Sequence, residues 1–129
     1  MKKIFFSVIL TAFLFGCSEP KADIEKLKAA SELVNQGQFE EGLSQLDAMA
    51  KRSPNDIALK QSRIQGHLKY GAYFLYSDTL SKKTQYRDAL REFRTVLKID
   101  PDNKDAKEQS ELIIGIYKQM GREIPAEEK

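Results

Sequence analysis

The sequence predicts an all-α protein in which antiparallel helix pairs stack side by side. Apolar residues recur three and four positions apart over most of the chain, which is the spacing of one helix face. A fixed repeat of helical segments is typical of stacked helix pairs rather than of one closed core. Such a repeat is present, because five landmarks return 47 residues later: Phe39 as Tyr86, Gly42 as Ala89, Leu43 as Leu90, Leu46 as Phe93 and Pro54 as Pro101.

The first helix pair is expected at residues 21–36 and 38–52. Gly37 is well placed to stop the first helix, because glycine tolerates the left-handed conformation that ends many helices. The second helix is apolar on one face only, and Pro54 ends it.

A long third helix is expected at residues 57–80, because no proline interrupts this segment. Gly66 and Gly71 each cost about 1 kcal/mol relative to alanine inside a helix, so we expect another helix to approach closely at both. The expected apolar stripe consists of Ile57, Ile64, Leu68, Gly71 and Leu75.

After a turn at residues 81–84, the fourth helix is expected at 85–99 and ends before Pro101. The fifth is expected at 102–120, with Gly121 as its stop. Residues 122–129 are expected to form a frayed tail. The inward face of the fifth helix should consist of Ala106, Ile113, Tyr117 and Met120.

The first sixteen residues have the form of an export signal. Lys2 and Lys3 give a positive start, the following run to Phe15 is almost wholly apolar, and Gly16 supplies a small residue before Cys17. The apolar run is shorter than the roughly 20 residues that a membrane span needs. Cys17 is the only cysteine, so the chain can form no internal disulfide.

The tetrapeptide LFGC at residues 14–17 resembles the lipobox of bacterial lipoproteins. The resemblance implies that residues 1–16 are removed as a signal peptide and that Cys17 carries fatty-acyl chains such as palmitate. Ser18 implies the outer membrane, facing the periplasm, since lipoproteins of the inner membrane tend to have aspartate there. Residues 17–22 would then be a lipidated tether for a helical domain at 23–121. The alternative is an ordinary signal peptide with an incidental cysteine.

Charge excludes one large class of partners. The chain has 21 Lys and Arg against 19 Asp and Glu, and removal of Lys2 and Lys3 would balance the two signs. Nucleic-acid binding needs a basic surface, and electrostatic membrane binding needs a polybasic run. We expect neither, and membrane attachment is expected through the N-terminal lipid.

The segments QGQFEEGLSQL…SPND and KTQYRDALREF…DPDN resemble tetratricopeptide repeats. In that family an aromatic residue wedges between helices, a small residue lets the partner helix approach, and a proline closes the repeat. The resemblance implies two repeats with the fifth helix as a cap, and a surface that binds another protein. HEAT or armadillo repeats, whose period also reaches about 47 residues, stay a minor alternative.

The spacing of 47 exceeds the roughly 34 residues of a tetratricopeptide repeat by roughly 13. If most of these residues lengthen one helix, the third helix extends beyond Tyr76 and overhangs its neighbours. We expect its end, together with a groove lined by the first, third and fifth helices, to be the docking surface.

No catalytic constellation, cofactor motif or metal-ligand spacing is visible, so we expect a protein that is not an enzyme and needs no cofactor. His67 is the only histidine and is expected on the polar face of its helix. An enzymatic or small-ligand pocket near His67, with Asp78 or Lys69, is the alternative. The carboxylates of Glu40, Glu41 and Asp88 are expected in the first turns of helices, where they meet the positive helix end.

Four aromatic residues within seven positions cannot all face one side of a helix. These are Tyr70, Tyr73, Phe74 and Tyr76. Packing against the fourth and fifth helices and an exposed anchor surface stay open as interpretations, and both can hold for different members. We expect Tyr70, Tyr73 and Tyr76 to bind a protein partner, because tyrosine is enriched at interface hot spots. The expected function is a lipid-anchored scaffold for another envelope protein, in assembly of an envelope, pilus or secretion complex.

Overall fold

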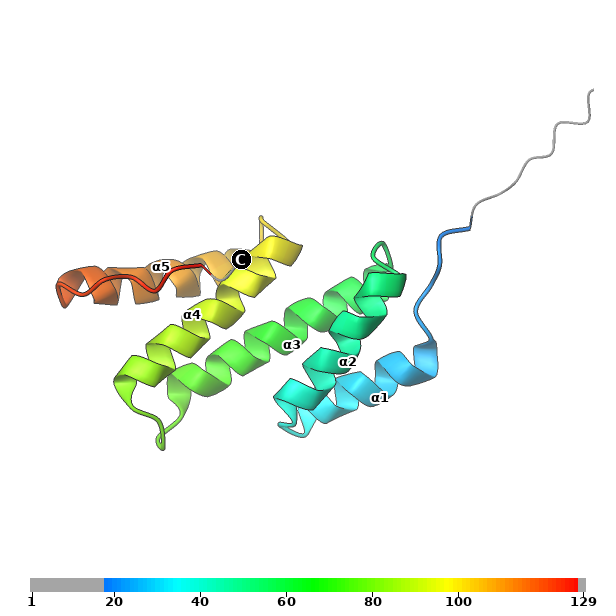
Figure 1. Cartoon of the computed structure of the whole chain (residues 1–129), viewed down its shortest axis with the longest axis horizontal. Helices are drawn as coiled ribbons and strands as arrows, with labels where there is room; N and C mark the ends of the chain where they lie inside the picture. The colour runs from blue at the N-terminus through cyan, green and yellow to red at the C-terminus, as the bar shows by residue number, and fades with distance from the viewer. Residues whose placement is uncertain (1–17, 128–129) are drawn as a thin grey trace, which may run out of the picture.

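The computed structural model describes residues 18–127, which form five α-helices (Figure 1). No strand occurs among these residues, and the predicted all-α stack of antiparallel helix pairs is confirmed. The helices are α1 (Ile24–Asn35), α2 (Phe39–Arg52), α3 (Ile57–Tyr76), α4 (Lys82–Ile99) and α5 (Lys104–Gln119).

Polar side chains set the start of four helices. An oxygen of each cap residue accepts a backbone N–H from the first turn, which would otherwise lack a partner. Asp23 and Ser81 explain why α1 begins at Ile24 and α4 at Lys82 rather than at the predicted positions. The four cap residues are Asp23, Asp56, Ser81 and Asn103.

The two proline turns repeat their hydrogen bonds as well as their sequence. After α2, the N–H of Ser53 donates to the carbonyl of Met49 and the N–H of Asp56 to that of Ser53. After α4, the same two bonds recur 47 residues later, from Asp100 to Val96 and from Asn103 to Asp100. The internal repeat therefore extends to the backbone of the turns.

The predicted close approaches at Gly66 and Gly71 are confirmed. A Cβ atom added to Gly66 would lie 2.7 Å from Cδ2 of Leu43 on α2, and one added to Gly71 would lie 2.7 Å from Cε1 of Phe93 on α4. The long helix α3 is thus packed on two sides, between α2 and α4 (Figure 1). Gly37 and Gly121 also end their helices as predicted, at φ 83° and 61°.

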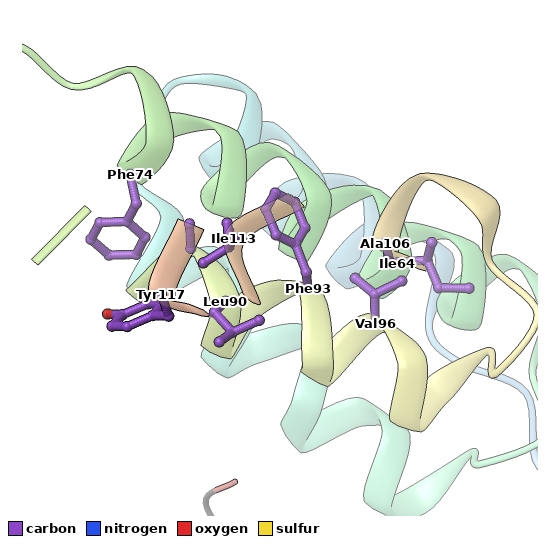
Figure 2. Packing of buried hydrophobic residues seen from close by; sticks show 9 residues of the cluster. Ile64, Phe74, Leu90, Phe93, Val96, Ala106, Ile113 and Tyr117 are labelled. Carbon is purple, nitrogen blue, oxygen red and sulfur yellow. The ribbon is translucent and has the colours of Figure 1, made fainter. Parts of the chain in front are cut away.

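The apolar core has two parts. The smaller joins α1, α2 and the start of α3 around Ala30, Leu46 and Leu59. The larger joins α3, α4 and α5, and Figure 2 shows Phe93, Leu90 and Ile113 lying close to one another within it. The fifth helix therefore caps the stack by closing the larger part.

The extension of the third helix beyond Tyr76 is wrong, although α3, with 20 residues, is the longest helix. The amide of Gln85 donates to the carbonyl of Ser77 just after α3, and Ser81 starts α4 within the expected turn. The extra residues are divided between α3, the turn and the first turn of α4. The extra helical turns belong to α3 and α4, which pack on each other.

Two residues that were predicted to face the core are exposed. Ile57 is 77% exposed because it is the first residue of α3, and Met120 is 49% exposed because it follows the last residue of α5. Three residues of the predicted tail contact the helices. Ile124 packs against the larger core, and Arg94 Nη1 donates to the carbonyl of Pro125 at 2.7 Å.

Candidate functional site

The end of α3 and the start of α2 form an aromatic surface, defined here as Phe39, Tyr70, Tyr73 and Tyr76. Phe39 is the first residue of α2, and its ring stacks on that of Tyr70 with centroids 4.8 Å apart. The Tyr73 centroid lies 5.4 Å from that of Phe39. Tyr73 and Tyr76 are 51% and 74% exposed, whereas Tyr70 is half-buried.

The core lies directly beneath the aromatic surface. Phe74 lies four residues after Tyr70, and their ring centroids are 4.4 Å apart. Phe74 is buried and belongs to the larger core with Leu90 and Tyr117. Phe74 therefore packs in the core, as the first interpretation expects, whereas Tyr73 and Tyr76 are exposed, and their role as anchors for a partner stays a prediction.

A carboxylate borders the aromatic surface. The hydroxyl of Tyr70 donates to Glu40 Oε1 at 3.2 Å. Burial raises the pKa of Tyr70 to about 12, and the hydrogen bond to Glu40 adds to the shift, because ionising Tyr70 would place two negative charges side by side. Tyr70 is therefore a neutral donor whose hydroxyl holds Glu40 at the edge of the rings.

The first-turn prediction is confirmed for Glu40 and Glu41 and wrong for Asp88. The two glutamates lie in the first turn of α2. Because α4 already begins at Lys82, Asp88 lies in its second turn, where it is buried and paired with Arg87 and Arg91 at 2.8 and 3.2 Å.

His67 is buried in the helix stack, not on a polar face as predicted. Its Nδ1 lies 2.8 Å from Glu92 Oε2 on α4, and both side chains are almost fully covered. Nε2 has no hydrogen-bond partner among the described residues. Of its two expected partners, Asp78 lies in the turn after α3, and Lys69 donates to Asn35 instead. Neither is brought to His67.

A cavity of about 430 Å³ lies beside His67. Its walls come from α2, α3, α4 and the C-terminal tail, which crosses at Pro125 and Glu127. Glu127 Oε1 is 3.9 Å from Arg94 Nε. A pocket near His67 was the predicted alternative, but its walls contain neither Asp78 nor Lys69, and the tail contact was not predicted, since both depend on residues far apart in the chain. The basic residues in its wall are Arg87, Arg91, Arg94 and Lys98.

Two of the three helices that were expected to line the groove share a hollow in the described part of the chain. A hollow of about 210 Å³ is lined by residues of α1 and α3, whereas α5 packs on α4. A hollow of about 660 Å³ lies elsewhere, between the start of α2 and the end of α3.

The predicted lipidation site, Cys17, lies outside the described residues. From residue 18 to residue 127, no helix is long and apolar enough to cross a membrane. Within the same range, no group of three His, Cys, Asp or Glu residues is placed to hold a metal ion.

The described part of the predicted tether contacts the domain at two points. Ala22 N–H donates to Asp56 Oδ2 at 2.9 Å, and Asn55 Nδ2 donates to Glu19 Oε1 at 3.1 Å. The tether therefore leaves the domain beside the turn between α2 and α3.

Comparison with known proteins finds no matching family model, curated protein or solved structure.

Proposed function

We propose that the chain is a non-enzymatic, lipid-anchored scaffold that binds another protein of the cell envelope through the aromatic surface. Its anchor is Cys17, in the outer membrane facing the periplasm. Assembly of an envelope, pilus or secretion complex is the kind of process that such a scaffold serves. The aromatic surface is the observation that carries the proposal.

Tyr73 and Tyr76 are the strongest support. A tyrosine that is half or more exposed in the free protein supplies a large apolar area to a partner with little loss of side-chain entropy. Tyr73 is also held by the neighbouring rings of Phe39 and Phe74, at 5.4 and 5.8 Å between centroids. A pre-ordered aromatic residue costs less to bind than a mobile one.

Site-directed crosslinking in the native envelope tests the scaffold proposal. A photoreactive phenylalanine analogue at position 38, which is exposed and lines the hollow beside Tyr70 and Tyr73, should capture one discrete protein. Tyr73→Ser with Tyr76→Ser should weaken its capture while the melting temperature stays nearly unchanged. Ile57→Ser with Leu112→Ser is the matched control, since both are exposed apolar residues elsewhere. Equal capture by the two double variants would contradict the proposal. A large drop in melting temperature for the tyrosine variant would show instead that these residues belong to the core.

Cys17→Ser tests the anchor. The variant should leave the membrane fraction, because acyl chains supply about 0.8 kcal/mol per buried methylene and no described helix replaces them. Normal processing with retention in a salt-washed membrane fraction would refute the lipoprotein proposal.

The second candidate is an enzyme or small-ligand binder that uses the cavity beside His67. The unpartnered Nε2 of His67 favours it, because a buried polar atom without a partner is costly and a ligand could supply one. His67→Ala distinguishes the candidates. Loss of biological activity with the fold and partner capture intact would favour the second, and unchanged activity would favour the scaffold.

A further inference from the structure

The aromatic surface borders a shallow hollow of about 660 Å³ between the start of α2 and the end of α3. One wall consists of the rings of Phe39, Tyr70 and Tyr73. Glu40 and Glu41 also line the hollow, and both are exposed. The hollow therefore combines aromatic rings with two solvated carboxylates.

The charge of this hollow has one sign. Its remaining lining residues are Asn, Gln and Gly, so no Lys, Arg or His among the described residues contributes to the wall. The ammonium group of Lys69 is held nearby, where it donates to Asn35. The Glu40 carboxylate is already one of the causes that raise the pKa of Tyr70. A cation entering the hollow would meet two carboxylates, and no positively charged side chain of the wall would compete with it for them.

The same group of rings already holds one cation within the chain. The guanidinium carbon of Arg91 lies 5.8 Å from the centroid of the Phe74 ring, within the range of a cation–π interaction. Phe74 is in turn 5.8 Å from Tyr73. Tyr73 presents a comparable ring towards solvent, beside two carboxylates instead of an arginine.

We propose that this hollow binds a lysine or arginine side chain of a partner protein, with its alkyl stem on the Phe39 and Tyr73 rings and its charge at Glu40 and Glu41. The inference rests on the proposed function in so far as the basic side chain belongs to a partner. Charge complementarity identifies the occupant, because opposite potentials across an interface select the partner and a like-charged one is rejected. An acidic or purely apolar segment would leave both carboxylates without a counter-charge.

The test is nuclear magnetic resonance of the full chain in a neutral detergent, with ¹³C-labelled tyrosine and phenylalanine rings. Three blocked tripeptides are titrated: acetyl-Gly-Lys-Gly-amide, acetyl-Gly-Arg-Gly-amide and acetyl-Gly-norleucine-Gly-amide. Norleucine has an alkyl stem without the charge. The Lys and Arg peptides should shift the Phe39 and Tyr73 signals saturably, and norleucine should bind about tenfold more weakly, since both charge and cation–π contact are lost. Equal responses to all three, or no saturable response to the charged ones, would overturn the proposal.

Matched variants locate the charge. Glu40→Gln with Glu41→Gln should weaken the Lys peptide about fivefold or more. Glu108→Gln with Glu111→Gln, which removes two exposed carboxylates from α5, should leave its binding unchanged. Circular dichroism checks that both double variants keep their helices. Equal weakening by the two pairs would show long-range charge alone and would overturn the assignment to this hollow.

The outcomes separate this inference from the scaffold proposal. Peptide binding without protein capture in the envelope would leave the cation site standing and remove the scaffold function. Capture that depends on Tyr73 and Tyr76, without peptide binding, would keep the scaffold and remove the cation site.

Discussion

The two helix pairs share their apolar landmarks and differ in the polar flank beside them. In the first pair, Glu41 and Gln45 of α2 are exposed. Their counterparts 47 residues later, Asp88 and Glu92 of α4, are buried. The apolar face is the same because the repeat pattern is the same, so the partner helix must account for the difference.

The partner helices supply the reason. In the first pair, α2 packs against α1, whereas α4 packs against α3. From α3, the His67 ring lies against Glu92. Buried carboxylates need partners, and Arg87 and Arg91 from the next positions along α4 supply them for Asp88. A repeat therefore determines which face is buried, and its neighbour determines how far burial extends around the helix.

The largest expected effect comes from the matched core residues. Phe93→Ala should lower the free energy of unfolding by about 3–5 kcal/mol and Leu46→Ala by about 2–5 kcal/mol, because each is almost fully buried and leaves a cavity. Denaturant unfolding followed by circular dichroism measures both. A loss below about 1 kcal/mol for either would break the equivalence of the two pairs.

Substitution of Gly42, where α2 packs on α1, should be tolerated less well than substitution of Gly115 on α5. Gly42→Ala would place a Cβ 2.7 Å from the backbone oxygen of Ala30, so we expect a loss of about 1–3 kcal/mol. Gly115→Ala meets nothing within 4 Å and should stabilise the helix by about 0.5–1 kcal/mol. Thermal unfolding of the two variants should move in opposite directions. A gain for Gly42→Ala would mean that α1 and α2 separate easily.

The polar flanks provide the third contrast. Glu92→Ala should cost about 1–3 kcal/mol, because it removes the only hydrogen-bond partner found for the buried His67 ring within the described residues. Gln45→Ala, at the exposed counterpart, should change stability by less than about 0.5 kcal/mol. Chemical denaturation compares them, and similar losses would contradict the argument that the partner helix distinguishes the two polar flanks.

The smallest expected effect distinguishes the caps Asp56 and Asn103, which are repeat counterparts. The backbone N–H of Leu59, followed by that of Ala22, lowers the pKa of Asp56 below 3.8. A lowered folded-state pKa means that the cap contributes its stability above pH 3.8 and loses it as the pH falls through the folded value. Asp56→Asn should flatten this acid limb, and Asn103→Asp should add one. Melting temperatures between pH 6 and pH 2.5 measure both, and unchanged acid limbs would refute the cap contribution.

Local patterns were sufficient for the helices and for the repeat. The stops at Gly37 and Gly121, the turns at Pro54 and Pro101, and the close approaches at Gly66 and Gly71 all follow from short-range geometry, and each is confirmed. The predicted end of α3 was wrong because the side chain of Gln85 donates to the carbonyl of Ser77, eight residues earlier, just after the helix ends. A single contact of this kind leaves no periodic pattern in the sequence from which it could be predicted.

The sequence by itself therefore determined the all-helical class, the helix pairs, the repeat and the apolar landmarks of α2 and α4. Only the tertiary structure decided that His67 meets Glu92, that Tyr73 stays exposed while Phe74 is buried, and that the tail reaches Arg94. The physical reason is range. Helix propensity, caps and apolar periodicity act within a few residues, whereas burial of a polar or aromatic side chain depends on which distant helix covers it.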